Sequence, residues 1–341
     1  MKILAIETSC DDTCAAVLEN DRVLSNVVSS QTDLHKDWGG VVPDIAKRAH
    51  QERIEPVVKT GLKRARVGME EIDVIAVTVG PGLAPALGVG VNFARELAGE
   101  YKKRLVAVNH IEGHILSNWI KNKNSKPERR IELPALVITV SGGHSKVIVM
   151  RDFGRYEVVG ETLDDAAGEA LDKAAKLLGL GYPGGPVVET VANNGQTDWL
   201  KLPKPLPNKN VLDFSFSGLK TSFYYQIKDW PQEKTNKHLT DLAASFQEAV
   251  FEHLVRKYKL AIERYQPKTL LASGGVMANQ VLRKKLRKVA REAGLPIYLP
   301  YKKVYNTDNA AMIGVAGYYK ALREEWSDPK TLDREPRAKL N

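Results

Sequence analysis

The chain has 341 residues, which is more than one compact hydrophobic core usually holds, so we expect two lobes with a cleft between them. Hydrophobic residues make up 43% of the sequence and charged residues 27%, and these globular proportions exclude disordered and fibrous classes. Lysine and arginine outnumber aspartate and glutamate by 50 to 41, and the resulting net charge of +9 suits a polyanionic partner without requiring one.

The N-terminal residues are apolar but reach acidic positions quickly, which is typical of neither a secretion signal nor a transit peptide. No apolar run approaches the roughly 18 to 20 residues of a membrane span, so we expect a cytoplasmic protein. Cys10 and Cys14 are spaced neither as a redox pair nor as half of a four-ligand zinc site. We expect two buried thiols without chemistry.

The first elements in the chain indicate an α/β fold that opens with a hairpin. Short β-branched runs predict strands at 3–7, 13–18 and 23–28, with a turn at Asn20 between the last two. A simple dinucleotide-binding fold would instead continue from its first strand into a helix. Apolar residues at helical spacing then predict helices at about 43–65 and 85–100, separated by a strand at 74–79 that ends in Gly80-Pro81-Gly82.

The second half continues the alternation. Strands are predicted at 136–140 and 269–272, and helices at about 164–179, 239–264 and 278–293. A polar stretch at 121–130 is expected to connect the lobes, and the segment after Trp326, charged in both signs, is expected to be loosely held. We divide the chain into a lobe at 1–130, a second lobe at 131–305 with an insertion at about 193–235, a helix at 306–326 packing back toward the first lobe, and a charged tail at 327–341.

Two of the predicted strands end in the same tripeptide, Ser141-Gly142-Gly143 and Ser273-Gly274-Gly275. Glycine lacks a Cβ, so backbone N–H groups of such loops can approach a phosphate closely. A single loop of this kind is usually only a tight turn, but two in matching context favour a nucleotide cleft. The sequence contains neither a P-loop nor a complete dinucleotide fingerprint.

His110 and His114 are spaced i, i+4, which on a helix directs both imidazoles from one face toward one cation. Such pairs are more often structural than metal-binding, so both interpretations are open. Glu112 is the third residue of the pentad, which is not the arrangement of the zinc proteases. Asp308, ahead of an apolar helix, is our candidate for a third ligand, and a helix N-cap is a second role compatible with it.

Two further groups of charged residues have both a structural and a functional interpretation. Asp172 and Glu189 could accept hydrogen bonds from a ribose, whereas the acids at 164–169 suit the start of a helix dipole. A basic helix is either a solvated face or a surface for a phosphate backbone. Its cationic residues are Arg283, Lys284, Lys285, Arg287, Lys288 and Arg291.

Together these motifs resemble the TsaD family, formerly called Gcp or O-sialoglycoprotein endopeptidase. The resemblance runs in order from residue 1 to about 320 and is closest to the bacterial and organellar branch. The matching segments are IETSCDDT at 6–13, GGVVP at 39–43, GPGL at 80–83, NHIEGH at 109–114, SGGH at 141–144, YPGG at 182–185 and FSFSGLKT at 214–221.

The resemblance implies an α/β, two-lobed actin-like ATPase fold of the sugar kinase, chaperone and actin superfamily, with a central nucleotide cleft that holds an adenylate substrate or ATP. It also implies transfer of a threonylcarbamoyl group from threonylcarbamoyl-adenylate to N6 of the adenosine beside the anticodon. The acceptors are tRNAs that read codons beginning with A, and the products are AMP and N6-threonylcarbamoyladenosine. Implied partners are the tRNA anticodon stem-loop, a paralogous subunit and a small ATPase.

Family positions transfer to individual residues of this chain. The metal ligands fall on His110, His114 and Asp308, with Fe(II) the usual ion and Zn(II) the other. The catalytic acids fall on Asp11 and Asp12, where the family often has Asp-Glu, and either is expected to take the proton from N6. Substrate-binding positions fall on Thr139, Val140, Ser141, Gly142, Gly143, Asp172, Gly185, Glu189 and Asn279.

Three other functions are alternatives to threonylcarbamoyl transfer. A small-molecule kinase of the same fold is the main enzymatic alternative, and a non-catalytic scaffold subunit is the binding-protein alternative. A metalloprotease is disfavoured by the position of Glu112 between the histidines.

Overall fold

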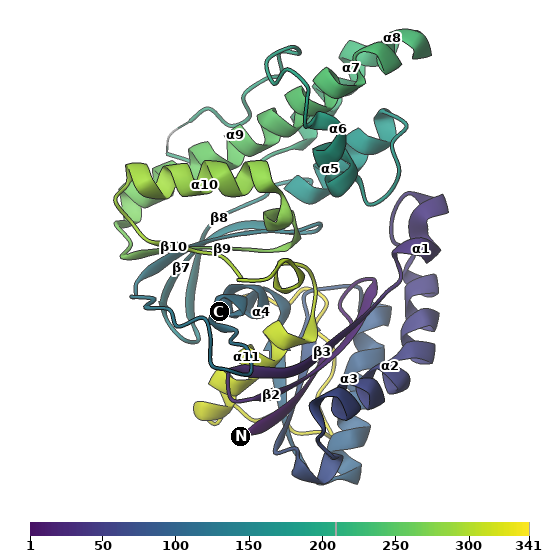
Figure 1. Ribbon diagram of the computed structural model, residues 1–341, viewed down its shortest axis with the longest axis vertical. Coiled ribbons are helices and arrows are strands. Elements are labelled where there is room, and N and C mark those ends of the chain that lie inside the picture. The colour runs from purple at the N-terminus through teal and green to yellow at the C-terminus, as the bar shows by residue number, and fades with distance from the viewer. Residues whose placement is uncertain (209, 341) are drawn as a thin grey trace. The chain divides into compact units, whose positions relative to one another are not determined.

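The computed structural model describes residues 1–208 and 210–340, and contacts divide them into two units (Figure 1). Unit 1 comprises Met1–Ile131, Phe153–Arg155 and the chain from Pro300 onward, and unit 2 comprises Glu132–Asp152 and Tyr156–Leu299. The insertion predicted at about 193–235 includes residue 209, and the predicted tail ends at residue 341. Those two positions lie outside the described residues.

Unit 1 contains a five-stranded sheet of order β3-β2-β1-β4-β5. The predicted opening hairpin is confirmed, because β1, β2 and β3 are joined antiparallel, while β4 runs parallel to β1 and β5 parallel to β4. The strands are β1 at Lys2–Glu7, β2 at Asp12–Glu19, β3 at Arg22–Ser30, β4 at Val74–Gly80 and β5 at Arg104–Asn109.

Helices cover both faces of this sheet (Figure 1). The predicted helices near 43–65 and 85–100 are α2 at Pro43–Ala65 and α3 at Ala84–Glu100, which bury Leu4 and Ile6 on one face. On the other face lies α11 at Ala310–Leu322, where a Cβ on Gly317 would come 2.5 Å from the Cβ of Ala76. The small residue therefore lets helix and sheet pack closely.

The remaining helices of unit 1 are short. They include α1 at Thr32–His35 and α4 at His110–Leu116, together with 3-10 turns at Lys36–Trp38, Met69–Glu71, Ser117–Trp119 and Lys303–Tyr305.

Unit 2 contains a second five-stranded sheet, of order β10-β9-β6-β7-β8. β6 runs parallel to β9 and antiparallel to β7, and α9 packs its apolar side chains against one face of the sheet. The strands are β6 at Ala135–Val140, β7 at Ser145–Asp152, β8 at Arg155–Glu161, β9 at Thr269–Ser273 and β10 at Ile297–Tyr298. The helices are α5 at Ala167–Leu177, α6 at Gly184–Ala192, α7 at Ser217–Ile227, α8 at Gln232–Lys237, α9 at Leu239–Tyr265, a 3-10 turn at Gly275–Ala278 and α10 at Gln280–Glu292.

These elements confirm the predicted α/β class. None of the helices in the described part of the chain has both the length and the apolar character that crossing a membrane requires.

The helix predicted from residue 164 begins later, at Ala167. Asp164 instead accepts hydrogen bonds from the backbone N–H groups of Phe216 at 2.7 Å and Ser217 at 3.2 Å. It therefore serves the start of α7 rather than its own helix, a role that only the folded chain reveals because the partners are some fifty positions away in sequence.

The charged tail is not loosely held, contrary to the expectation from its composition. The backbone N–H of Glu335 donates to the carbonyl oxygen of Val79 at 2.7 Å, and the side-chain amide of Asn109 donates to the carbonyl oxygen of Lys339 at 3.0 Å. Arg95 of α3 donates to the carbonyl oxygen of Pro329 at 2.6 Å. The many charged side chains of the tail correctly indicated that it lies at the surface. Backbone hydrogen bonds nevertheless hold the tail to unit 1.

Candidate metal centre and nucleotide-binding loops

The histidine pair lies on a short, well-capped helix of unit 1. The side-chain oxygen of Asn109, the last residue of β5, accepts hydrogen bonds from the N–H groups of Ile111 at 2.8 Å and Glu112 at 3.3 Å. This cap starts α4 at His110, so the predicted i, i+4 spacing occurs on a helix. The two imidazole rings are buried with their centroids 4.6 Å apart.

Asp308 approaches both histidines from the start of α11. Its Oδ1 lies 3.2 Å from Nε2 of His114 and 3.6 Å from Nε2 of His110. The second expected role of Asp308, as helix cap, is wrong, because Asn309 caps α11 by accepting a hydrogen bond from the N–H of Met312 at 3.1 Å. One potential ligand atom from each of the three residues lies within 4.8 Å of the other two.

The geometry and chemistry of this cluster fit a divalent cation. Both ring nitrogens of His114 are buried without a well-oriented hydrogen bond among the described residues, although Nε2 lies 3.2 Å from Oδ1 of Asp308, and such polar atoms are costly unless something satisfies them. Bonds of about 2.1 Å to one ion would place ligand atoms about 3 to 3.4 Å apart. Oδ1 of Asp308 lies at close to that separation from Nε2 of His114 and Nε2 of His110, at 3.2 and 3.6 Å. Two imidazoles and one carboxylate that leave further positions open suit Fe(II) or Zn(II).

The two histidines differ in their electrostatic surroundings. Burial lowers the pKa of His114, which keeps its ring in the neutral form that can bind a metal. Burial acts in the same direction on His110, but the negative charges of Asp308 and Glu7 outweigh it and raise the pKa of His110 to about 9. Without a cation, His110 is therefore protonated near neutral pH.

Glu7 is a residue of this site that the sequence interpretation missed. It ends β1 with its side chain fully buried, and Oε2 lies 3.2 Å from Nδ1 of His110. Burial opposes its charge, but His110 and the hydrogen bond from Ser9 hold the pKa of Glu7 below its ordinary value. An acidic side chain that ends an otherwise apolar buried strand was the signal that could have identified it.

Asp11 and Asp12 lie where the chain turns from β1 into β2. Burial, followed by the charges of Asp11 and Asp308, raises the pKa of Asp12 to about 7. Burial also raises the pKa of Asp11. Oδ1 of Asp12 is buried without a hydrogen-bond partner in the described part of the chain. Asp12 therefore titrates in the range where a carboxylate can accept a proton during turnover.

In unit 2 the two predicted Ser-Gly-Gly loops lie side by side. Thr139 of β6 is paired in register with Ser273 of β9, and their hydroxyl oxygens are 3.1 Å apart. Gly274 has φ +97°, and a Cβ there would come 2.3 Å from the carbonyl oxygen of Val140. Glycine is therefore required at this position for the loops to meet.

The first of these loops also contacts the start of α5. The carbonyl oxygens of Ser141 and Gly142 accept hydrogen bonds from the N–H groups of Gly168 at 3.3 Å and Glu169 at 3.1 Å. A Cβ placed on Gly142 or Gly143 would meet no other atom within 4 Å. The side of the loop where those two residues lie is thus open to a ligand.

The other predicted substrate-binding residues each make a local contact in unit 2. Oδ1 of Asp172 accepts hydrogen bonds from the N–H groups of Gly184 at 2.7 Å and Gly185 at 3.2 Å, which joins α5 to the start of α6. Oε1 of Glu189 accepts from the N–H of Gln280 at 2.7 Å. The side chain of Asn279 caps α10 through the N–H of Val281 and that of Leu282.

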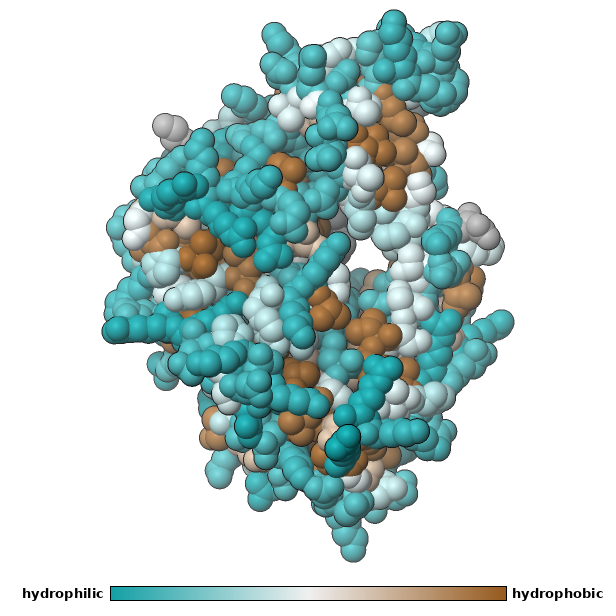
Figure 2. Space-filling model, viewed as in Figure 1, coloured by the Kyte–Doolittle hydropathy of each residue, from teal (hydrophilic) through white to brown (hydrophobic). Residues whose placement is uncertain are grey.

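The basic helix is α10, and its cations are not equivalent. Lys285 is half-buried and lies 2.6 Å from Glu248 and 2.7 Å from Glu252. Lys284, Arg287 and Lys288 are exposed. The surface over α10 is hydrophilic in Figure 2. Only the exposed cations are placed to meet a polyanion, because Lys285 is already neutralised.

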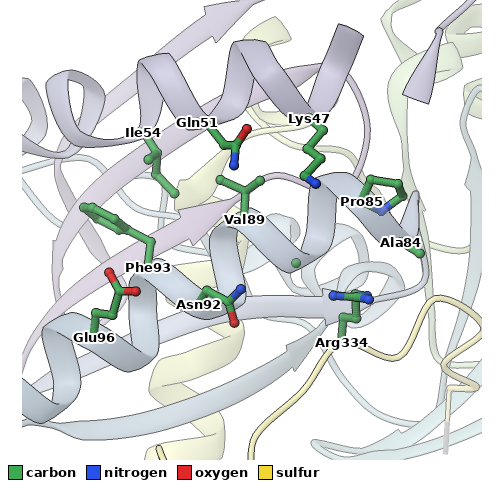
Figure 3. Close-up of a pocket in the computed structure, with 11 residues that line it drawn as sticks. Lys47, Gln51, Ile54, Ala84, Pro85, Val89, Asn92, Phe93, Glu96 and Arg334 are labelled. Carbon is green, nitrogen blue, oxygen red and sulfur yellow. The ribbon is translucent and has the colours of Figure 1, made fainter. Parts of the chain in front are cut away.

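A separate hollow of about 590 Å³ lies in unit 1 between α2, α3 and the tail (Figure 3). Lys47 and Gln51 of α2 face Val89 and Asn92 of α3, and Arg334 of the tail borders it (Figure 3). None of the predicted site residues lines it.

Comparison with known proteins yields a family match over most of the chain. Residues 22–315 match the model of the TsaD family, described as tRNA N6-adenosine threonylcarbamoyltransferase. The chain is 43% identical over 340 residues to the protein of that description from Thermosipho africanus, covering 100% of both. It is 46% identical over 333 residues to the one from Caldicellulosiruptor saccharolyticus, covering 97% of this chain and 96% of the relative.

Solved structures with a similar fold are more distant. The chain is similar to HypF from T. kodakarensis with a TM-score of 0.63 at 16% identity, over 95% of this chain and 48% of that one. It is also similar to the activator of the 2-hydroxyisocaproyl-CoA dehydratase from Clostridium difficile with bound ADPNP, with a TM-score of 0.52 at 14% identity, over 96% and 99%. At such identities the likeness bears on the fold alone, and it confirms the predicted fold.

Proposed function

The chain belongs to the TsaD family, whose members are tRNA-modifying transferases, and from this premise we propose that its donor is threonylcarbamoyl-adenylate. The acceptor is N6 of the adenosine next to the anticodon in tRNAs that read codons beginning with A. The products are AMP and N6-threonylcarbamoyladenosine. The observation that supports this most is the cluster of His110, His114 and Asp308, in a chain similar to the family over its whole length.

We assign the divalent cation to His110, His114 and Asp308, with Fe(II) or Zn(II) as the ion. When bound, it supplies a Lewis acid for the carbonyl oxygen of the threonylcarbamoyl group. The protein contributes a neutral, fully buried His114 and the Asp308 carboxylate, which would hold the ion.

In unit 2 we assign the adenylate to the paired loops and the residues beside them. Backbone groups of Ser141, Gly142 and Gly143 bind the phosphate, since no Cβ of the two glycines holds a ligand away. The carboxylate of Asp172 fixes the backbone of Gly184 and Gly185 through two hydrogen bonds, and this backbone binds the nucleoside. The remaining positions of this proposed site are Thr139, Val140, Glu189 and Asn279.

The transfer step requires a proton acceptor, and we assign this role to Asp12. N6 of the adenosine attacks the carbamoyl carbon of the mixed anhydride, and the bond from that carbon to the phosphate oxygen breaks. AMP leaves with the electron pair, and Asp12 takes the proton released from N6. Asp12 suits this role better than Asp11, because its pKa is raised to about 7.

The test supplies purified chain with threonylcarbamoyl-adenylate and unmodified tRNA and analyses the nucleosides by mass spectrometry. It is run with and without a paralogous partner subunit and a small ATPase. The modified adenosine should form from the adenylate, and a matched tRNA lacking adenosine beside the anticodon should stay unmodified. Absence of product with every partner present would contradict the proposal, and phosphorylation of a sugar or acid from ATP in a parallel reaction would favour the kinase alternative.

A further inference from the structure

The buried carboxylate of Glu7 makes polar contacts with three residues of unit 1, namely Ser9, Thr78 and His110. Oε1 accepts a hydrogen bond from the backbone N–H of Ser9 at 2.5 Å. Oε2 accepts one from the hydroxyl of Thr78 on β4 at 2.6 Å and lies 3.2 Å from Nδ1 of His110. Glu7 has no exposed surface, so it cannot touch a substrate directly.

This arrangement decides which nitrogen of His110 carries a proton. An ionised carboxylate only accepts hydrogen bonds, so the nitrogen facing it must be an N–H. Nδ1 is therefore protonated, and a neutral His110 offers the lone pair of Nε2. That nitrogen is the one 3.6 Å from Asp308, on the side of the ring where the cation is assigned.

We propose that Glu7 is a positioning residue that acts through His110, holding the proton on Nδ1 so that Nε2 can bind the cation. This inference rests on the proposed metal site. Metal-bound histidines commonly donate their other N–H to a carboxylate, which fixes the tautomer and the ring orientation and makes the ligand nitrogen more basic.

Ser9 is the other group that could control the tautomer, since its hydroxyl oxygen lies 3.1 Å from the same Nδ1. A hydroxyl rotates and can either donate or accept, so it adapts to whichever tautomer is present. The carboxylate has no such freedom. Ser9 can therefore accept a hydrogen bond from the N–H at Nδ1, but Glu7 determines that Nδ1 carries the proton.

The isosteric change Glu7→Gln is the sharpest probe because the two carboxylate positions are not equivalent. The backbone N–H of Ser9 cannot turn away, so the amide oxygen of Gln must occupy the Oε1 position. The amide NH2 is then forced into the Oε2 position, where it donates to Nδ1 of His110. The Thr78 hydroxyl can rotate to accept from it. The substitution thus favours the tautomer with the proton on Nε2, which leaves that nitrogen without a lone pair for the cation.

The test measures Zn²⁺ and Co²⁺ affinity of the full-length chain by competition with a chelator. Glu7→Gln is expected to weaken binding by about 10- to 100-fold, the range seen when the carboxylate behind a metal-bound histidine is changed. Thr78→Val is the matched control, since it removes a buried hydrogen bond to the same carboxylate while keeping its charge on His110, and should change affinity by no more than about threefold. Thermal unfolding of each variant in chelator separates loss of fold from loss of affinity.

Two further measurements keep the inference testable if Glu7→Gln does not fold. Glu7→Asp keeps an acceptor-only carboxylate but places it farther from Nδ1 of His110. It should weaken metal affinity less than Glu7→Gln does. In the Zn²⁺-loaded wild-type chain with ¹⁵N-labelled histidine, NMR should show His110 protonated at Nδ1. Affinity unchanged in both Glu7 variants, or a proton on Nε2, would overturn the Glu7 assignment alone. A wild-type chain that binds neither metal would overturn the metal site together with this inference.

Discussion

Oε1 of Glu112 lies 3.8 Å from Nη2 of Arg323. The acid between the two histidines therefore faces the far end of α11, where Oε2 also lies 3.9 Å from Nζ of Lys320. These contacts of Glu112 link α4, which carries the histidines, to α11, which follows Asp308. A carboxylate stabilised by two cations is a poor general base, which argues against the metalloprotease alternative.

The first prediction concerns this contact. Glu112→Gln should keep threonylcarbamoyl transfer within about threefold, because Glu112 does not belong to the metal cluster. It should reduce the free energy of unfolding by about 1 to 3 kcal/mol, less than for a fully buried ion pair since Lys320 and Arg323 also contact Glu325. Transfer assays and denaturant unfolding measure the two effects, and loss of transfer in a stably folded variant would contradict this assignment.

The second prediction concerns pH. Burial, with the charges of Asp11 and Asp308, raises the pKa of Asp12 to about 7, and a general base works only when deprotonated. The transfer rate should therefore rise with pH and level off above about 7. A cation on Asp308 removes part of that charge and would shift the rise to lower pH. Asp12→Asn should slow transfer by roughly 10²- to 10⁴-fold and abolish the rise. Asp11→Asn, the matched control, should keep the rise but shift it to lower pH, because the charge of Asp11 is one of the causes that raise the pKa of Asp12.

The third prediction compares neighbouring glycines at the end of β9. Gly274→Ala forces a side chain into φ +97° and to within 2.3 Å of the carbonyl oxygen of Val140, so it should cost about 1 to 3 kcal/mol of stability and weaken ATP binding. Gly275→Ala meets no atom within 4 Å and should do neither. Denaturant unfolding and nucleotide titration measure the difference. Equal effects would mean that the contact between the two loops is unimportant.

The fourth prediction concerns the salt dependence of tRNA binding. If α10 contacts the phosphate backbone, Arg287→Ala should lower the slope of log affinity against log salt by about 0.7 to 0.9. Lys285→Ala should leave that slope unchanged, because Lys285 is neutralised by Glu248 and Glu252, and should instead cost stability. Filter binding over a salt series tests both. An unchanged slope for Arg287→Ala would exclude it from a phosphate contact.

Features carried by neighbouring residues were predictable from the sequence, and features made by distant ones were not. The spacing of His110 and His114 and the two Ser-Gly-Gly loops follow from local patterns. The contact of Glu7 with His110 joins positions 103 apart. The acidic end of an apolar strand marks Glu7 as unusual, but nothing in the local sequence identifies its partner. The tail illustrates the same limit, since composition reports the charge of its side chains but not the backbone partners that hold it.

The central claim is that transfer depends on a cation held by His110, His114 and Asp308. The most direct measurement is formation of N6-threonylcarbamoyladenosine by chain stripped of metal and then reloaded with Fe(II) or Zn(II), beside His114→Ala treated in the same way. Stripping should abolish product and reloading should restore it in the wild-type chain only. Full product from the stripped wild-type chain, or from His114→Ala, would contradict the account.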